Sequence, residues 1–164
     1  MEDDGIYGYG GNLTIDESSE VAGAKVEEDL AAYVASFRQL HVYREAMRLA
    51  REVFLVSRNF PKEETYSMTD QIRRSSRAIS ANIAEAWAKR EYEPHFISKL
   101  SDSLAETYET QAWLDHAVSC DYLTPDQFAV IDPICHFVAA MLRNTSAKSA
   151  SFCGKLPRPP TSHS

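Results

Sequence analysis

From residue 37 onward, apolar residues recur every three to four positions, and four such segments predict four helices. The first helix is expected at about 40–58, the second at about 67–89, the third at about 94–119, and the fourth from Thr124. This part of the chain shows no long alternating runs and no Asn-Gly or Asp-Gly turns, so it predicts no strands. Short links between long amphipathic helices favour an all-α, antiparallel up-down-up-down four-helix bundle.

Capping and breaking residues set the expected helix ends. Pro61 ends the first helix. The run "SMTD" places a carboxylate three residues after a predicted cap at Ser67, and "TPDQ" combines a Thr124 cap with a proline at the first helical position and a glutamine that completes a capping box. Pro133 lies inside the fourth helix, where we expect it to kink or restart the helix.

The second helix carries a tight apolar stripe with a polar stripe beside it. The apolar stripe consists of Met68, Ile72, Ile79, Ile83 and Ala86. The polar stripe contains Gln71, Asn82 and Glu85, which we interpret as buried hydrogen-bonding residues that fix the register of the helices.

Two helices show more apolar surface than one core requires. Apolar residues of the first helix cover roughly half of its circumference, wider than the ~100° stripe that packing on one core demands. In the third helix, a tryptophan points away from the buried stripe and lies among acidic residues. Exposed aromatic patches often mark interfaces, so we predict oligomerisation. The interface candidates are Tyr43, Phe54, Trp87 and Trp113.

Composition places the chain among soluble globular proteins. Its 164 residues suggest one domain, and its 44% apolar and 25% charged content is ordinary for that class. No apolar run approaches the ~20 residues of a membrane span. Three widely spaced cysteines favour reduced thiols and therefore the cytoplasm. We divide the chain into an acidic, largely disordered extension (1–36), a four-helix bundle (37–150) and a flexible tail (151–164).

The net charge of −7 is unevenly distributed. Residues 1–35 hold nine acidic residues and only Lys25, a net charge of −8, so the remaining residues are nearly neutral. Within that remainder, residues 37–58 and 67–90 each carry +3, whereas residues 91–119 carry −5. Two basic helices beside an acidic one can steer self-assembly or bind a polyanion.

The arginines of the two basic helices therefore have two interpretations. They can contact phosphates as a basic stripe, or they can pair with the acidic third helix within or between subunits. Charge matching slightly favours pairing. The nucleic-acid-binding candidates are Arg44, Arg48, Arg51, Arg73, Arg74 and Arg77.

Signatures of enzymes and metal sites are missing from the sequence. His116 with Cys120, and Cys135 with His136, do not form the paired ligand sets of zinc sites, and no helix has the Glu-x-x-His spacing of di-iron bundles. A Gly-x-Ser-x-Gly elbow and glycine-rich phosphate loops are also missing. We predict no enzymatic activity, no catalytic residues, no metal and no cofactor.

Three segments carry a resemblance to a known family: "LHVYREAMRLAREVF", "FPKEETYSMTDQIRRSSRAISANIAEAWAKR" and "HFISKLSDSLAETYETQAWLDHAVSCDYL". Over roughly residues 37–145 the chain resembles the bacterial four-helix-bundle proteins encoded within intervening sequences of large-subunit ribosomal RNA genes. The resemblance implies a left-handed antiparallel bundle that assembles as a ring-like homopentamer. A relative of similar fold, the accessory variability protein of diversity-generating retroelements, binds a reverse transcriptase and nucleic acid.

The same resemblance identifies the family's polar positions in this chain, and it also shows where the sequence differs from the family pattern. The positions that match the family's polar motif are Gln71, Arg73, Arg74, Asn82, Glu85, Ser103 and Glu106. Where the family usually has glycine and then a small or basic residue after "NIAE", this chain has Ala86 and Trp87, and Asp102 replaces another usual glycine. We therefore expect the second helix to continue further, or Trp87 to pack into a partner.

The functional prediction is a non-enzymatic oligomeric bundle that acts as a scaffold or accessory factor for a nucleic-acid or ribonucleoprotein partner. The alternative is a purely protein-binding scaffold with a regulatory acidic tail. Binding through phosphates weakens steeply with ionic strength, whereas an apolar protein interface barely responds, so salt distinguishes the two.

Overall fold

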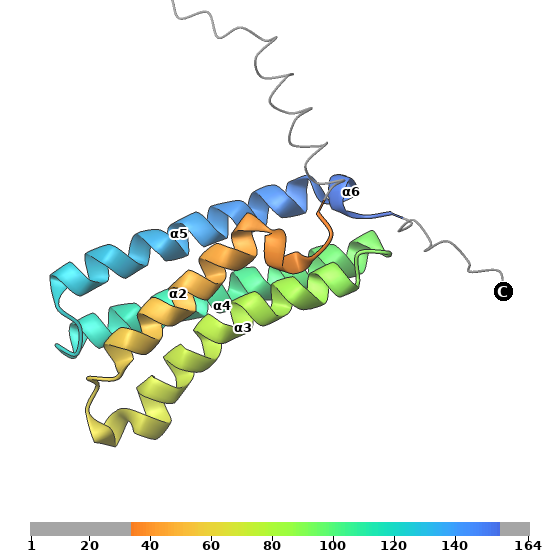
Figure 1. The fold of residues 1–164 in the computed structure, drawn as a ribbon. Coiled ribbons are helices and arrows are strands. Elements are labelled where there is room, and N and C mark those ends of the chain that lie inside the picture. The colour runs from red at the N-terminus through yellow and green to blue at the C-terminus, as the bar shows by residue number, and fades with distance from the viewer. Residues whose placement is uncertain (1–33, 155–164) are drawn as a thin grey trace, which may run out of the picture.

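The computed structural model describes residues 34–154 as a bundle of four long helices (Figure 1). These are α2 (His41–Ser57), α3 (Asp70–Ala88), α4 (Glu93–Ser119) and α5 (Pro125–Ala147). The shorter elements are η1 (Phe37–Gln39), η2 (Lys62–Glu64), the π-helical turn η3 (Thr65–Thr69) and α6 (Ser149–Phe152). The described residues contain no strand, so the predicted all-α fold is confirmed. Most of the predicted acidic extension and of the C-terminal tail lies outside the described residues.

Each long helix packs against the next one in the chain, and α5 closes the bundle against α2. The core lies where the apolar stripes of the helices meet. The predicted stripe of α3 is buried along its whole length, with Ile72 and Ile79 fully enclosed. From α4, Phe96 and Leu114 reach the same core. Burial of these stripes holds the helices together because apolar surface leaves water.

One of the two predicted helix caps is present. Thr124 accepts a hydrogen bond from the Gln127 backbone at 3.2 Å, and the Gln127 side chain accepts one from the Thr124 backbone at 2.9 Å. The predicted cap at Ser67 is wrong, because Ser67 lies within η3 and its hydroxyl donates to Glu64. Helix α3 follows η3 directly, so backbone carbonyls of that turn are available to the first amides of α3 and no side-chain cap is present.

The predicted restart at Pro133 does not occur, since α5 runs from Pro125 to Ala147 without interruption, while the alternative, a kink, stays a prediction. Proline removes one helical hydrogen bond and crowds the carbonyl of the fourth residue before it, here Ala129. Both Pro133 and Ala129 are exposed, so water can satisfy that carbonyl while the opposite side of the helix keeps its packing.

Helical structure continues slightly past the predicted boundary at residue 150. Helix α6 ends at Phe152, whose ring stacks on Phe96 with a centroid distance of 6.0 Å. The Ser149 hydroxyl of α6 donates to the Glu93 carboxylate at 2.5 Å. These contacts attach the end of the described chain to the start of α4.

Candidate interaction surfaces

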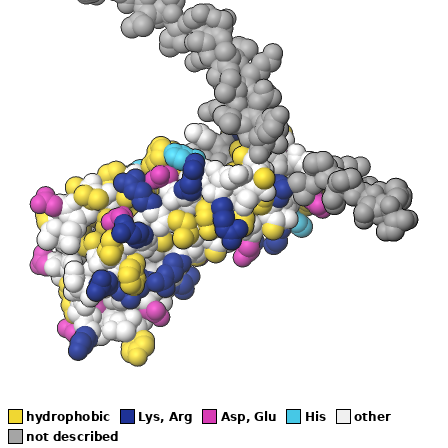
Figure 2. Space-filling model, in the orientation of Figure 1, with side chains coloured by type: hydrophobic (Ala, Val, Ile, Leu, Met, Phe, Trp, Pro, Cys, Tyr) yellow, Lys and Arg dark blue, Asp and Glu magenta, His cyan; other side chains and the backbone are white. Residues whose placement is uncertain are grey.

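The outer surface of α2 and the adjoining edge of α3 combine arginines with exposed apolar side chains. Figure 2 shows dark-blue Lys and Arg groups on this side of the molecule, with yellow apolar side chains between them. We call this surface the basic face. Its arginines are Arg44, Arg48 and Arg51 of α2, Arg58 directly after α2, and Arg73 and Arg77 of α3.

Helix α2 leaves large apolar side chains in solvent, as its wide apolar arc predicts. Met47 is 48% exposed, Phe54 39% and Leu55 38%. Tyr43 is half-buried, and its ring meets that of Phe37 edge-on at a centroid distance of 5.0 Å. Phe54 is therefore the most accessible of the predicted aromatic interface residues on this helix.

The arginines of the basic face differ in how they are paired. Arg48 contacts Glu45 at 3.2 Å and Arg51 contacts Glu52 at 3.5 Å, but both arginines are largely exposed, so these ion pairs add little stability. The other three arginines outside Arg73 make no side-chain hydrogen bond or ion pair within residues 34–154: Arg44, Arg58 and Arg77. These three guanidinium groups are available to an external anion.

Arg73 joins α3 to α2. Its Nε donates to the Ser57 hydroxyl at 2.7 Å, and its guanidinium carbon lies 5.1 Å from the centre of the Phe54 ring. The second distance is within the range of a cation–π contact. Arg73 is thus held at the rim of the apolar patch around Phe54.

Arg74 belongs to a different surface, because it pairs with the acidic helix α4. Its Nη2 lies 2.5 Å from Glu109 and its Nη1 lies 3.7 Å from Glu106. The interpretation that arginines pair with the third predicted helix is therefore confirmed for Arg74, within one chain. Trp113 also donates to Glu109, at 3.3 Å, and its half-buried ring packs against the core, so it is not the fully outward-pointing residue that its sequence position indicates.

The predicted polar stripe of α3 lies along the edge of the α3–α4 interface rather than inside it. Gln71 is half-buried and accepts a hydrogen bond from Arg74. Glu85 is exposed and contacts Lys99 at 2.9 Å. Asn82 is half-buried, and its side chain makes no hydrogen bond to another described residue. The prediction that these residues are buried hydrogen-bonding groups is wrong, because solvent reaches this edge of α3.

Buried hydrogen bonds between α3 and α4 come instead from small hydroxyl residues. Ser103 donates to the Ile79 carbonyl at 2.9 Å. The hydroxyls of Thr110 and Ser75 are 3.0 Å apart. We call this set, all of it fully buried, the hydroxyl row: Ser75, Ser103, Thr107 and Thr110. Spacings of four and three residues between Ser103, Thr107 and Thr110 are the sequence signal that identifies one helix face.

The pKa values of two carboxyl groups at the α3–α4 interface are shifted in opposite directions. One oxygen of Glu106 is buried without a hydrogen-bond partner among the described residues. Burial, and then the nearby charge of Glu109, raise the pKa of Glu106, while Arg74 lowers it. The hydrogen bond from Lys99 lowers the pKa of Glu85 and in turn raises the pKa of Lys99.

Trp87 is buried in the core of its own chain, so it is unavailable to a partner. Arg90 covers its ring at 3.8 Å from the centroid and donates to its backbone carbonyl at 2.6 Å. Helix α3 continues through this position to Ala88. The interface assignment of Trp87 is therefore wrong, because the residue packs inside its own chain.

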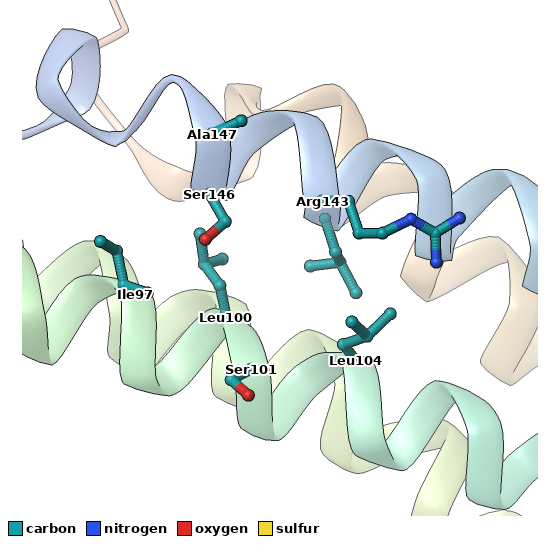
Figure 3. A pocket seen from close by; sticks show the side chains of 8 residues that line it. Ile97, Leu100, Ser101, Leu104, Arg143, Ser146 and Ala147 are labelled. Carbon is teal, nitrogen blue, oxygen red and sulfur yellow. The ribbon is translucent and has the colours of Figure 1, made fainter.

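A shallow hollow lies between α4 and α5 (Figure 3). Aliphatic side chains form most of its lining, among them Ile97, Leu100 and Leu104 of α4. Arg143 lies at its edge and donates to the Tyr108 hydroxyl at 2.6 Å. Within residues 34–154, no three His, Cys, Asp or Glu side chains converge as metal ligands would. None of the described helices is long and apolar enough to cross a membrane.

These features define a small antiparallel helical bundle with a basic and apolar outer face. The chain belongs to the 23S rRNA-intervening sequence protein family, whose model matches residues 38–144. It is similar to a solved structure from Bacteroides thetaiotaomicron VPI-5482, a protein of unknown function from the S23 ribosomal protein family. The two share 27% identity and a TM-score of 0.59, and the match covers 65% of this chain and 95% of that one. A search of curated proteins finds no match.

Proposed function

We propose that this protein is a non-enzymatic, oligomeric helical bundle that acts as a scaffold or accessory factor for a nucleic-acid or ribonucleoprotein partner. The observation that carries the proposal is the basic face, where Arg44, Arg58 and Arg77 stand unpaired among the described residues beside exposed Met47 and Phe54. Guanidinium groups bind phosphates, and exposed apolar patches mark interfaces. The family name, which refers to 23S rRNA, agrees with a partner of this class.

Self-association is the second part of the proposal. The apolar part of the basic face is the surface we assign to contact between copies of the chain, in a homopentamer of the kind that the family resemblance implies. Phe54 and Met47 would be covered there, because large apolar side chains left in solvent gain most from burial. That the accessory variability protein of diversity-generating retroelements is a relative stays a prediction. Its binding of a reverse transcriptase and nucleic acid is an example of the class of partner that we propose.

The RNA part is tested by binding of a structured RNA at several salt concentrations. The variant Arg44→Gln/Arg58→Gln/Arg77→Gln removes three unpaired charges, and we expect a loss in affinity of about tenfold or more with a shallower salt dependence. Arg74→Gln is the matched control, since it removes one charge from α3 at a position already paired with Glu106 and Glu109. Each is also measured with the acidic residues of 1–33 replaced by amides, because that segment repels RNA.

Light scattering after size exclusion tests assembly in the same set of proteins. We expect an oligomer for the native chain and dissociation on Phe54→Glu. A monomeric native chain would contradict the proposed role as an oligomeric scaffold. An oligomer that ignores RNA in every variant, with or without the acidic residues, would leave only the protein-binding scaffold.

A further inference from the structure

The segment before Val34 and the basic face carry opposite charges. Residues 1–33 contain nine Asp and Glu residues against one Lys, a net charge of −8. On the basic face, six arginines have only Glu45 and Glu52 as paired carboxylates. Opposite charges of this size attract over about a Debye length, ~10 Å at 0.1 M salt.

Residues 1–33 join the bundle at the edge where the basic face lies. Val34 and Phe37 pack against the core, and the Phe37 ring lies 5.0 Å from that of Tyr43 at the start of α2. Element η1 also contacts α3. The chain therefore enters the bundle beside both helices that form the basic face, close to its first arginine, Arg44.

The length of the segment is sufficient to cover the face. From Arg44 to Arg58 the face extends about 21 Å along α2, at 1.5 Å per residue. The acidic run Glu27, Glu28 and Asp29 precedes Val34 by five to seven residues, which span about 17–23 Å when extended. This run can therefore reach Arg44 at the near end of the face, whereas Glu17 and Glu20, which lie further from Val34 in the chain, have the length to reach Arg58.

We propose that residues 1–33 dock on the basic face of their own chain, with the carboxylates of 27–29 near Arg44 and the acidic residues earlier in the segment paired to Arg77 and Arg58. The tether favours this contact over one between separate molecules, because it raises the local concentration of the segment to the millimolar range, roughly. A consequence that rests on the proposed function is that a polyanionic partner must displace the segment before it reaches the arginines.

Arginine modification of the full chain tests the docking without RNA. Phenylglyoxal labelling, read by mass spectrometry, is compared between the native chain and a variant in which the nine Asp and Glu residues of 1–33 are replaced by Asn and Gln. We expect labelling of Arg44, Arg58 and Arg77 to rise at least about threefold in the variant, since reactivity follows the uncovered fraction. Salt at about 1 M should raise labelling of the native chain to the same extent.

Arg143 is the internal control, because it lies on α5 and bonds to Tyr108, away from the basic face. Its labelling should not change between the two proteins. Equal labelling of Arg44, Arg58 and Arg77 in the native chain and the variant would overturn the docking. A difference in labelling between the native chain and the variant that grows with protein concentration would also overturn it, since an intramolecular contact is independent of concentration.

The experiments can refute the docking of residues 1–33 and the proposed function independently of each other. If the arginines are uncovered in the variant and no form of the chain binds RNA, the docking stands and the nucleic-acid role falls. If RNA binds the native chain and the variant equally well and arginine labelling is the same in both, the docking falls and the nucleic-acid role stands.

Discussion

The hydroxyl groups of Ser75 and Thr110 lie 3.0 Å apart in the fully buried centre of the α3–α4 interface. Ser75 donates to the Ile72 carbonyl of its own helix, and Thr110 shares its single hydroxyl hydrogen between Ser75 and the Glu106 carbonyl. The contact between the two helices is therefore polar although no solvent reaches it. A shift of one helix along the other would separate the hydroxyls, so the pair fixes the register of α3 against α4.

A double-mutant cycle should detect this contact. Thr110→Val keeps the side-chain shape and removes the hydroxyl, and we expect it to lower the free energy of unfolding by about 1 kcal/mol. Combined with Ser75→Ala, the loss should be smaller than the sum of the two single losses, by roughly 0.5 kcal/mol or more. Urea denaturation measures all four proteins. Strict additivity would mean that the hydroxyls do not interact.

Ser103 offers a second test with a control two residues away. Its hydroxyl bonds the Ile79 carbonyl across the interface while the side chain is fully buried. Ser103→Ala leaves that carbonyl with fewer partners and should cost about 1–2 kcal/mol of stability. The exposed Ser101→Ala should stay within about 0.5 kcal/mol of the native chain. Similar losses from both substitutions would contradict a specific role for the buried bond.

The raised pKa of Glu106 gives a pH-dependent prediction. Its ionised form is disfavoured in the folded chain, so it costs stability above the folded pKa, and the cost disappears below the unfolded pKa. Glu106→Gln should therefore raise the free energy of unfolding at pH 7, by up to about 1 kcal/mol, and change little below about pH 4. Thermal unfolding across this range measures the effect. A variant that is destabilised at neutral pH would show that the Arg74 contact outweighs burial.

Glu85 should behave in the opposite way. The hydrogen bond from Lys99 lowers its pKa, so the carboxylate stabilises the folded chain above its unfolded pKa and loses that contribution as the pH falls through the folded value. Glu85→Gln should lower the unfolding temperature slightly at pH 7 and leave it unchanged in acid. The same thermal series tests it, and an equal loss at both pH values would exclude an ionic contribution.

The cysteines should differ sharply in reactivity. Burial, and then the charge of Asp132, raise the pKa of Cys135 to about 12, whereas Cys120 is exposed. Iodoacetamide at about pH 8 should alkylate Cys120 first and reach Cys135 only when the chain unfolds. Mass spectrometry of the alkylated peptides, with a urea-unfolded sample as the control, measures both rates. Comparable rates in the folded chain would show that α5 opens readily near Cys135.

Periodicity and capping residues predicted the helices of this fold well. The bounds of α2, α4 and the start of α5 depend on local signals that act within a few residues, and the Thr124 capping box is one of these. The predicted cap at Ser67 was wrong because helical backbone already begins before it, in the turn η3, which the sequence did not indicate. The expected restart at Pro133 was wrong, because the cost of a proline inside a helix depends on whether the freed carbonyl faces water.

Site residues were harder to predict, because their environment depends on the neighbouring helix. The helical angle of Trp113 indicates an outer position, but the ring bends back against the core. Trp87 also faces inward, and only the position of Arg90 shows how its ring is covered. Pairing of Arg74 with Glu109, in contrast, follows from the opposite charges of α3 and α4 and was predictable as a class of contact. Only the structure shows which arginines stay unpaired.

The hydroxyl row also has a consequence for the order of folding. Only residues 89–92 separate α3 from α4, so the loop that must close between them is short. Contacts between α2 and α5, in contrast, join the two ends of the bundle and are expected to form later. We therefore expect the α3–α4 hairpin to serve as the nucleus, with its amides the slowest to exchange with solvent. Helix α2, which carries the basic face, would then be the element that the chain can release while the rest stays folded.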